Sequence, residues 1–205
     1  MGKNIQAKCA IIVSYNPDIE MLKNLCIKVI SSGYNVIIVD NSNDVNFSCI
    51  LKLKDCQIIY NRKNLGIATA QNIGVNAALD SNVKIVTFLD QDSDISEFQL
   101  NALSSEVIKD SSNIYAPTAI DKSTYREYPS IIFNKYGLPS KVYSNDLKEL
   151  VITDLVISSG VTCSIKIFDL IGLFDEDLFI DFVDVDWCLR SEEHTSELQS
   201  RHNLV

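Results

Sequence analysis

Apolar runs of strand length alternate with segments of helical periodicity along most of the chain. Short apolar runs bounded by polar residues are typical of buried strands, and apolar positions that recur every three or four residues indicate one buried face of a helix. The alternation predicts an α/β domain with a Rossmann-like, mostly parallel central sheet flanked by helices. Strands are expected at residues 8–14, 34–40, 56–61, 83–90, 113–120 and 150–160.

The intervening segments carry helix signals. The first predicted helix has Asn16 as N-cap, Pro17 in its first turn and Gly33 after its last turn. A second helix, from Leu65 to Leu79, has a stripe of mostly small residues that allows close approach to a sheet or a ligand. The stripe consists of Ile67, Ala70, Gly74 and Ala77. Further helices are expected at 95–111 and 164–174, and a loop or small hairpin between Lys122 and Glu149.

The composition of the chain argues against several classes of function. A chain of 205 residues that is 46% hydrophobic suits one domain, and its net charge of −9 argues against a nucleic-acid partner. No apolar run approaches the roughly 18–20 residues that a membrane span requires. Six cysteines without a C-x-x-C pair, together with the absence of a signal sequence, predict reduced thiols and a cytoplasmic location. The two histidines, His194 and His202, lie near the end, so any general base is expected to be a carboxylate.

Polar residues follow four of the predicted strands, at 15–16, 40–41, 61–64 and 90–92. In parallel α/β sheets, ligands collect at the carboxyl ends of the strands, around a switch in strand order. The convergence of these polar exits therefore predicts a ligand site at that edge of the sheet.

The segment FLDQDSD places Asp90 and Asp92 two residues apart after a buried strand. Two carboxylates repel a diphosphate unless a divalent cation lies between them, and Mg²⁺ or Mn²⁺ prefers such oxygen ligands. The alternative is an Asx-turn followed by a helix N-cap at Asp94 or Ser96. The spacing alone leaves both interpretations open.

Two further segments are weaker signals. Asp40, in VDNSN, could accept hydrogen bonds from a base or a ribose, but the segment taken alone favours an ordinary turn. Gly66 lies at a predicted helix start, with Asn64 and Asn72 as amide donors and acceptors nearby. This segment is neither a Walker loop nor a G-x-G-x-x-G motif, so a phosphate cradle here is a weak prediction.

In FIDFVDVDWCLR, three aspartates lie among aromatic and aliphatic residues: Asp181, Asp184 and Asp186. A carboxylate with apolar neighbours tends to have a raised pKa, which suits a general base. The alternative is a solvated helix N-terminus whose acids complement the helix dipole.

With these residues in view, the chain resembles the family 2 glycosyltransferases of GT-A fold, and most closely their bacterial rhamnosyltransferase branch. Six segments carry the resemblance, in family order, from Ala7 to Arg190: VSYNPD, VDNSN, NLGIATAQNIG, FLDQDS, ISSGVTCSIKIFDLIGLFDEDLFID and VDVDWCLR. Each segment is a modest signal, whereas six in order are specific.

The resemblance implies a GT-A domain over residues 1–190 that uses Mg²⁺ or Mn²⁺. It implies inverting transfer of rhamnose from dTDP-rhamnose to a hydroxyl of a lipid-linked or polysaccharide acceptor, with peripheral contact at the inner membrane face. In the family the base lies in a Glu-Asp pair; here Val183 replaces that Glu, so Asp184 inherits the role, with Asp181 or Asp186 as substitutes. The implied metal ligands are Asp92 and Asp90. The implied donor-binding residues are Tyr15, Asp40, Asn41, Asn64, Gly66, Asn72 and Asp90.

The end of the chain continues none of these patterns. RSEEHTSELQS resembles the in-frame translation of a common sequencing adapter, so residues 191–205 are expected to be a non-native tail. Members of the family continue beyond the C-L-R segment, so the chain is expected to be C-terminally truncated and is a candidate for an inactive form.

Two other classes of function compete with the transferase. A non-catalytic nucleotide-sugar-binding domain would keep the donor cleft without acceptor machinery. A nucleotidyltransferase would also use metal-binding acids on an α/β domain, but it would usually need a Gly-rich basic loop near the N-terminus, which VSYNPD is not.

Overall fold

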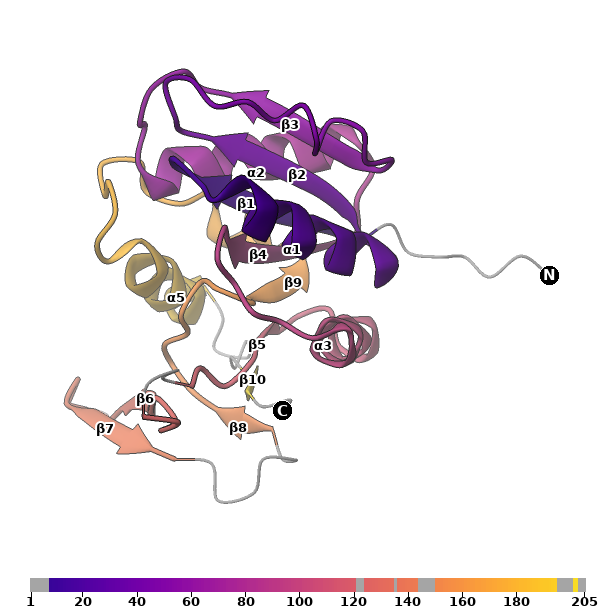
Figure 1. Ribbon diagram of the computed structural model, residues 1–205. Coiled ribbons are helices and arrows are strands. Elements are labelled where there is room, and N and C mark those ends of the chain that lie inside the picture. The colour runs from indigo at the N-terminus through magenta and orange to yellow at the C-terminus, as the bar shows by residue number, and fades with distance from the viewer. Residues whose placement is uncertain (1–7, 121–123, 135, 144–149, 195–200, 203–205) are drawn as a thin grey trace.

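The computed structural model describes residues 8–120, 124–134, 136–143, 150–194 and 201–202 (Figure 1). Its central sheet begins with four parallel strands in the order β3–β2–β1–β4. They are β1 (Lys8–Ser14), β2 (Asn35–Asp40), β3 (Cys56–Tyr60) and β4 (Ile85–Asp90). Every residue of β2 after Asn35 is buried, as are the first five residues of β4. The continuous apolar runs therefore mark strands covered on both faces, as predicted.

The second half of the sheet is mixed in direction. Here β9 pairs antiparallel with both β4 and β5, and β10 lies between β5 and β8. A separate hairpin joins β6 to β7, which confirms the small excursion expected before residue 149. The bounds are β5 (Ile114–Ala116), β6 (Ser130–Phe133), β7 (Pro139–Val142), β8 (Val151–Ile152), β9 (Thr162–Ser164) and β10 (Arg201–His202).

The strand predicted at 150–160 is mostly wrong, because only β8 forms there. Thr153 and Asp154 instead bind the backbone of the hairpin. The Thr153 hydroxyl oxygen accepts a hydrogen bond from the Ile131 amide (3.1 Å) and donates one to the Ile131 carbonyl (2.8 Å). The Asp154 carboxylate accepts from the Phe133 amide. Side-chain hydrogen bonds of this kind replace a strand ladder, which an apolar pattern does not reveal.

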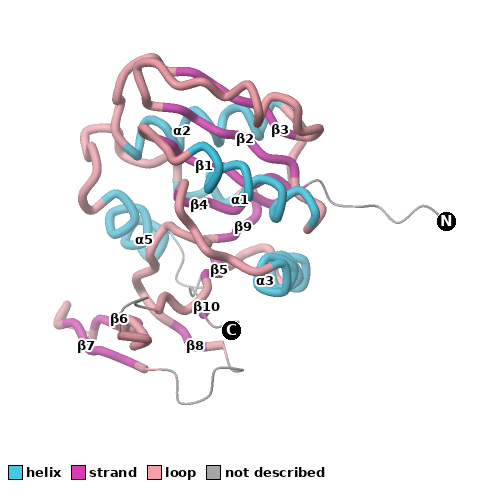
Figure 2. The backbone as a smooth tube through the Cα atoms, in the orientation of Figure 1, coloured by secondary structure: helices cyan, strands magenta, loops and turns pink. Residues whose placement is uncertain are grey.

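Helices cover both faces of the sheet in three layers (Figures 1 and 2). One apolar cluster packs α1 and α3 against one face, and a second packs α2, α4 and α5 against the other. The helices are α1 (Ile19–Ser31), α2 (Ile67–Asp80), α3 (Glu97–Lys109), α4 (Ile167–Ile171) and α5 (Val183–His194). The helix α3 begins with a capping box in which Ser96 and Gln99 bind each other's backbone amides.

The predicted N-cap of the first helix is wrong. Asp18 caps α1, because its carboxylate accepts the Met21 amide hydrogen bond at 3.0 Å. Asn16 lies outside the helix with φ 47°, and its amide donates to the Ser42 hydroxyl at 2.7 Å. The hydrogen bond to Ser42 therefore holds Asn16 beside the end of β2, and α1 begins only after Asp18. Gly33 follows the helix with φ 81°, as predicted.

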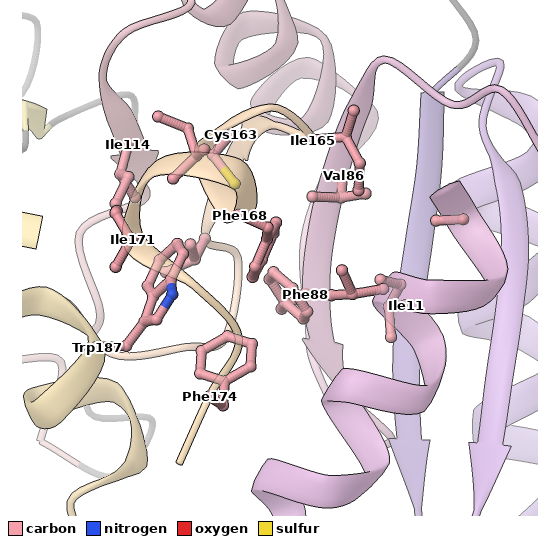
Figure 3. Packing of buried hydrophobic residues seen from close by; sticks show 14 of the residues in the cluster. Ile11, Val86, Phe88, Ile114, Cys163, Ile165, Phe168, Ile171, Phe174 and Trp187 are labelled. Carbon is pink, nitrogen blue, oxygen red and sulfur yellow. The ribbon is translucent and has the colours of Figure 1, made fainter. Parts of the chain in front are cut away.

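The small residues of α2 bring this helix close to β1. A Cβ atom on Gly74 would lie 2.4 Å from Cγ2 of Ile11. Farther along the same face, an aromatic cluster joins β4 to α5 (Figure 3). Phe174 lies edge-on to Phe88 with ring centroids 5.4 Å apart, and Trp187 stacks on Phe168 at 5.2 Å. This cluster fixes the position of α5 relative to the end of β4.

The helix α5 continues past Arg190 to His194, and residues 201–202 form β10. That residues 191–205 are non-native stays a prediction, and 195–200 and 203–205 lie outside the described residues. The six cysteines are free thiols, four of them buried, as the sequence predicts. Among the described residues, no helix is both long and apolar enough to cross a bilayer.

Candidate active site

The polar exits of the four parallel strands lie at one edge of the sheet, as predicted. In the register of the sheet, Ser14 at the end of β1 pairs with Asp40 and Val13 pairs with Asp90. Tyr60, at the end of β3, pairs with Asp40. Because these strands are parallel, the residues that follow them emerge side by side.

Asp40 is buried between two hydroxyl groups. Its Oδ1 atom accepts hydrogen bonds from Ser14 (2.9 Å) and Ser42 (2.8 Å), and the residue is 1% exposed. The carboxylate therefore ties the exit of β1 to that of β2. Any contact of Asp40 with a nucleoside stays a prediction.

A ladder of amides links the exits of β2 and β3 to the start of α2. The Asn41 amide nitrogen donates to the Gly66 carbonyl (3.0 Å), and its oxygen accepts from Asn61 (2.9 Å). The Asn64 oxygen accepts from the Gly66 amide at 3.0 Å. Gly66 has φ 84°, and a Cβ there would lie 2.5 Å from the Phe179 carbonyl oxygen. This position therefore requires glycine both for its backbone conformation and for its close approach to the segment before α5.

Asn72, which the sequence offered as an amide donor and acceptor near Gly66, is buried between α2 and the segment before α5. It is 2% exposed, and its amide joins α2 to the segment before α5. The side-chain nitrogen donates to the Phe174 carbonyl and to Glu176, both at 2.9 Å, and the oxygen accepts from the Phe174 amide at 2.9 Å. These bonds hold the fold together, and a contact of Asn72 with the donor stays a prediction.

The turn after β4 connects Asp90 to the neighbouring strand. The Gln91 side chain accepts from the Tyr15 amide (2.7 Å) and donates to the Tyr15 carbonyl (3.3 Å). The Ser93 hydroxyl accepts from the Asp90 amide at 2.9 Å. Asp90 and Asp92 both face solvent in part. The predicted helix N-cap at Ser96 thus coexists with two exposed carboxylates, so an N-cap and a metal site in this segment do not exclude each other.

Ser158, Ser159 and Gly160 belong to the site, although the sequence analysis assigned them no role. The Gly160 amide donates to the Phe88 carbonyl (2.7 Å), which places this turn beside the end of β4. The Ser159 hydroxyl lies 2.8 Å from that of Ser93. The Ser158 amide donates to the Asp184 carboxylate at 3.3 Å. These residues open ISSGVTCSIKIFDLIGLFDEDLFID, one of the six segments that carry the family resemblance, but only the fold shows what they contact.

The three candidate bases in and just before α5 differ in their surroundings. Its buried face, which includes Val183 and Trp187, packs on the core and leaves Asp184 beside Ser158. Asp186 is held by Arg190 in an ion pair of 2.8 Å, and the same guanidinium donates to the Ile171 carbonyl. Asp181 is exposed in the turn before the helix.

Electrostatics links Asp184 to the end of β4. The pKa of Asp90 is raised, mainly because the surrounding protein removes the carboxyl from water. A hydrogen bond with Ser159 lowers the pKa, and the like charges of Asp92 and Asp184 raise it further. Asp92 and Asp184, which come from two distant parts of the chain, therefore both act on the charge of Asp90.

Asp90 and Asp92 line an open cleft of about 490 Å³. One wall carries Asp90 and Asp92, and the opposite wall carries Ile120, Tyr125 and Ile157. Within the described residues, no group of three or more His, Cys, Asp or Glu side chains is placed to hold a metal ion by itself. The two partly exposed carboxylates offer oxygen ligands that suit a divalent cation whose remaining ligands come from a bound phosphate.

A comparison of the chain with known protein families identifies the family to which it belongs. The model of "Glycosyl transferase family 2" matches residues 9–161, which include the four parallel strands and the Asp90–Asp92 turn. The chain belongs to glycosyl transferase family 2. Asp184 lies beyond the residues matched by this family model.

A curated relative extends the match within glycosyl transferase family 2. The chain is 35% identical over 193 residues to a protein described as dTDP-rhamnosyl transferase RfbF of Shigella flexneri. The match covers 93% of this chain and 64% of that protein, so the chain spans less than two thirds of the length of this relative.

Solved structures show the fold. A structure of GalNAc-T7 with UDP, GalNAc and Mn²⁺ superposes with a TM-score of 0.78, 16% identity, and coverage of 98% of this chain and 43% of that one. S. aureus TarS gives a TM-score of 0.69 at 16% identity, with coverage of 97% and 37%. These likenesses establish the GT-A fold expected from the sequence.

Proposed function

We propose that this chain is the nucleotide-sugar-binding and catalytic part of an inverting glycosyltransferase. One observation carries the proposal: the turn at 158–160 packs beside the end of β4 and binds Asp184 through the Ser158 amide, which brings Asp184 to the sheet edge that carries Asp90 and Asp92. Membership of glycosyl transferase family 2 supports it. The donor would lie across the exits of β1, β2 and β3, with Tyr15, Asp40, Asn41, Asn64 and Gly66 forming or supporting its site.

Asp184 is the proposed general base. A base must reach the acceptor hydroxyl and be free to take its proton. Asp186 is engaged by Arg190, whereas Asp184 has only hydrogen bonds from backbone amides at 3.3 and 3.1 Å and a long contact with the Ser158 hydroxyl. In the proposed reaction, Asp184 accepts the hydroxyl proton while the acceptor oxygen attacks the anomeric carbon. The bond from that carbon to the nucleoside diphosphate breaks on the opposite face, which inverts the configuration.

Asp90 and Asp92 are the proposed metal ligands. A bound Mg²⁺ or Mn²⁺ ion would neutralise charge on the departing diphosphate. The raised pKa of Asp90 supports this role, because a cation would offset the like charges that now face it. The similar structure of GalNAc-T7 was solved with Mn²⁺, which is in accord with such a site.

We further propose dTDP-rhamnose as the donor and a glycan precursor as the acceptor. The description of the Shigella flexneri relative as a dTDP-rhamnosyl transferase supports this donor. A cytoplasmic location and contact with the inner membrane face remain predictions from the sequence resemblance.

Donor binding tests the proposal. Isothermal titration of the 205-residue chain with dTDP-rhamnose, with and without Mn²⁺, is expected to show metal-dependent binding that UDP-N-acetylglucosamine does not match. Asp92→Asn should lose the metal dependence. A panel of nucleotide sugars that shows no metal-dependent binding would remove the basis of the transferase proposal.

The base is tested by turnover. Asp184→Asn is expected to lower transfer by about 10²–10⁴-fold while leaving donor affinity unchanged. Asp186→Asn is the matched control on the same helix and should retain turnover. Equal turnover of wild type and Asp184→Asn would move the base to Asp181. Donor binding without any turnover in the wild type would favour a non-catalytic binding domain.

A further inference from the structure

Side chains of α5 bind the last carbonyl groups of α4 and of the turn that follows it. The final carbonyls of a helix have no partner within the helix, so another group has to bind them. Nη1 of Arg190 donates to the Ile171 carbonyl and Nη2 to the Leu173 carbonyl, both at 2.9 Å. Between these two, the Gly172 carbonyl accepts from Nε1 of Trp187 at 3.1 Å. Three successive carbonyls therefore depend on two residues of α5 that lie about one turn apart.

Arg190 uses each of its three nitrogen atoms on a different acceptor. Nε donates to the Asp186 carboxylate at 2.8 Å, one turn earlier on the same helix, while Nη1 and Nη2 bind the two carbonyls beside α4. The guanidinium is a rigid planar fork, so these partners together fix its plane. A lysine ammonium is a point charge and cannot reproduce the three separate directions. Arg190 is therefore a geometric link between α5 and the end of α4 as well as the partner of an ion pair.

The contacts at the other end of α5, around Asp184, are longer. The Ser158 amide and hydroxyl lie 3.3 and 3.5 Å from the Asp184 carboxylate. Between the two ends, Trp187 stacks on Phe168 with ring centroids 5.2 Å apart (Figure 3). Such apolar burial keeps the helix against the core but is largely non-directional. The short hydrogen bonds of Arg190 therefore set the rotation of α5 about its axis, and Asp184 follows because both residues belong to one helix.

A small rotation of α5 is enough to displace the proposed base. Side chains extend about 5–6 Å from a helix axis, so a rotation of about 20° moves the Asp184 carboxylate by about 2 Å. A displacement of this size would break the contact with the Ser158 amide, which is already long. For a catalytic group, a misplacement of about 1 Å can lower the rate by about 10²-fold.

We propose that Arg190 is a positioning residue for Asp184: it fixes the rotation of α5 on the end of α4 and thereby holds the proposed base beside Ser158. The inference rests on the proposed transferase function. Asp186 then has the role of orienting the guanidinium. Its replacement by asparagine keeps an oxygen that can accept the Nε hydrogen bond, in accord with the turnover expected of Asp186→Asn.

The amide resonance of Ser158 reports the position of Asp184 without requiring turnover. Asp184→Ala removes the carboxylate that this amide binds, so the amide proton should move upfield in an NMR spectrum of the 205-residue chain. Arg190→Met and Arg190→Lys should move the same resonance in the same direction, because both lose the planar fork. A wild-type Ser158 resonance in Arg190→Met would overturn the positioning role.

Gly33→Ala is the control for a loss of stability alone. It strains the backbone at φ 81° just before β2 begins, at the end of this strand opposite Asp40. The variant should have a lower Tm than the wild type and an unchanged Ser158 resonance. A Ser158 shift in Gly33→Ala as large as that in Arg190→Met would show that the resonance follows stability, and would overturn the inference.

Trp187 is the only tryptophan of the chain and is 1% exposed, so its fluorescence shows whether α5 stays docked. In both Arg190 variants the emission maximum should keep its wild-type wavelength, because the apolar face of the helix remains packed. Emission at the wavelength of the urea-unfolded chain would show that Arg190 is needed for docking as a whole. That result would also overturn a role in positioning.

Turnover links the position of Asp184 to the reaction. Release of dTDP from dTDP-rhamnose with Mn²⁺, with water as the acceptor, is the assay. Arg190→Met is expected to lower kcat by about 10²-fold with the donor KM unchanged, and Arg190→Lys should not restore it. Wild-type kcat in Arg190→Lys would show that charge alone suffices and would overturn the inference. Absence of donor binding or of turnover in the wild type would instead overturn the transferase proposal, and the Ser158 resonance would still test the positioning role.

Discussion

The substitution Asn72→Asp tests whether this residue supports the fold or contacts the donor. It keeps the size of the side chain and removes both N–H donors. The Phe174 carbonyl and Glu176 then lose their hydrogen bonds. A buried carbonyl left unpaired costs about 1–3 kcal/mol.

The new carboxylate also faces Glu176, whose oxygen lies 2.9 Å from the Asn72 nitrogen. Like charges at such separations repel by about 4 kcal/mol at an effective dielectric near 20. Glu176 is exposed, so solvent reduces the repulsion to about 1 kcal/mol. The expected loss of unfolding free energy is therefore about 2–4 kcal/mol. For a domain of this size, that lowers Tm by roughly 4–16 °C.

The loss should depend on pH. Burial and a neighbouring carboxylate raise the pKa of the introduced aspartate above its unfolded value. The charged form therefore costs stability at neutral pH, and the deficit shrinks as the pH falls through the folded pKa. Thermal unfolding followed by circular dichroism at pH 7 and at pH 5 measures both effects.

Asn101→Asp is the matched control. The Asn101 oxygen accepts from the Lys8 ammonium at 3.3 Å, so an aspartate there gains an ion pair. Its Tm should stay within the range expected for a change of about 0.5 kcal/mol. If Asn72→Asp unfolds at the wild-type temperature but no longer binds dTDP-rhamnose, Asn72 is a donor contact and the structural account is refuted.

Three further predictions concern stability and reactivity. Gly66→Ala places a Cβ 2.5 Å from the Phe179 carbonyl oxygen at φ 84°, and should lower stability by about 2–4 kcal/mol in urea unfolding. Gly137→Ala, at φ 74° with open space around it, should lose only about 1–2 kcal/mol, and equal losses would show that the contact with Phe179 is unimportant. Asp90→Asn should raise Tm at pH 7 in the presence of a chelator, because the pKa of Asp90 is raised and its charged form therefore costs stability above the unfolded pKa. The gain in Tm should vanish below about pH 4, where the carboxyl is protonated in both states. A lower Tm of the variant at pH 7 would contradict this sign. Burial raises the pKa of Cys9 to about 12 and also raises that of Cys163, so Ellman's reagent should modify Cys49 and Cys56 first in the native protein, and rapid modification of Cys163 would contradict the packing.

The sequence predicts the elements of this fold where burial is continuous. The runs at β1, β2 and β4 are apolar on both faces, so their pattern is unambiguous. The pattern fails at 150–160, where Thr153 and Asp154 bind the hairpin through side chains. It also fails at Asn16, because the contact that displaces the helix start comes from Ser42, at the exit of another strand.

The candidate site was predictable to the extent that it follows strand ends. Asp90 ends β4 and Asp92 lies two residues later, and Asp184 lies in a recognisable acidic segment. Ser158 and Ser159 lie in a segment that carries the family resemblance, but their contacts were not predictable, because they depend on a turn that packs beside β4 from about seventy residues away in the chain. Asn72 is the converse case, since its sequence context suggested a ligand contact and its observed partners are the Phe174 backbone and the Glu176 side chain.

The aromatic cluster between β4 and α5 has a consequence for the order of events during folding. Phe88 and Trp187 are about a hundred residues apart in the chain, and closing so long a loop is entropically costly until its ends can pack. The strands β2 and β4, which carry Asp40 and Asp90, can each pair with β1 during synthesis before α5 has left the ribosome. Asp184 reaches Asp90 only when that final packing occurs. A nascent or partly folded chain therefore holds the strands of the proposed donor site without the proposed base, and the proposed transfer would require α5 to have docked.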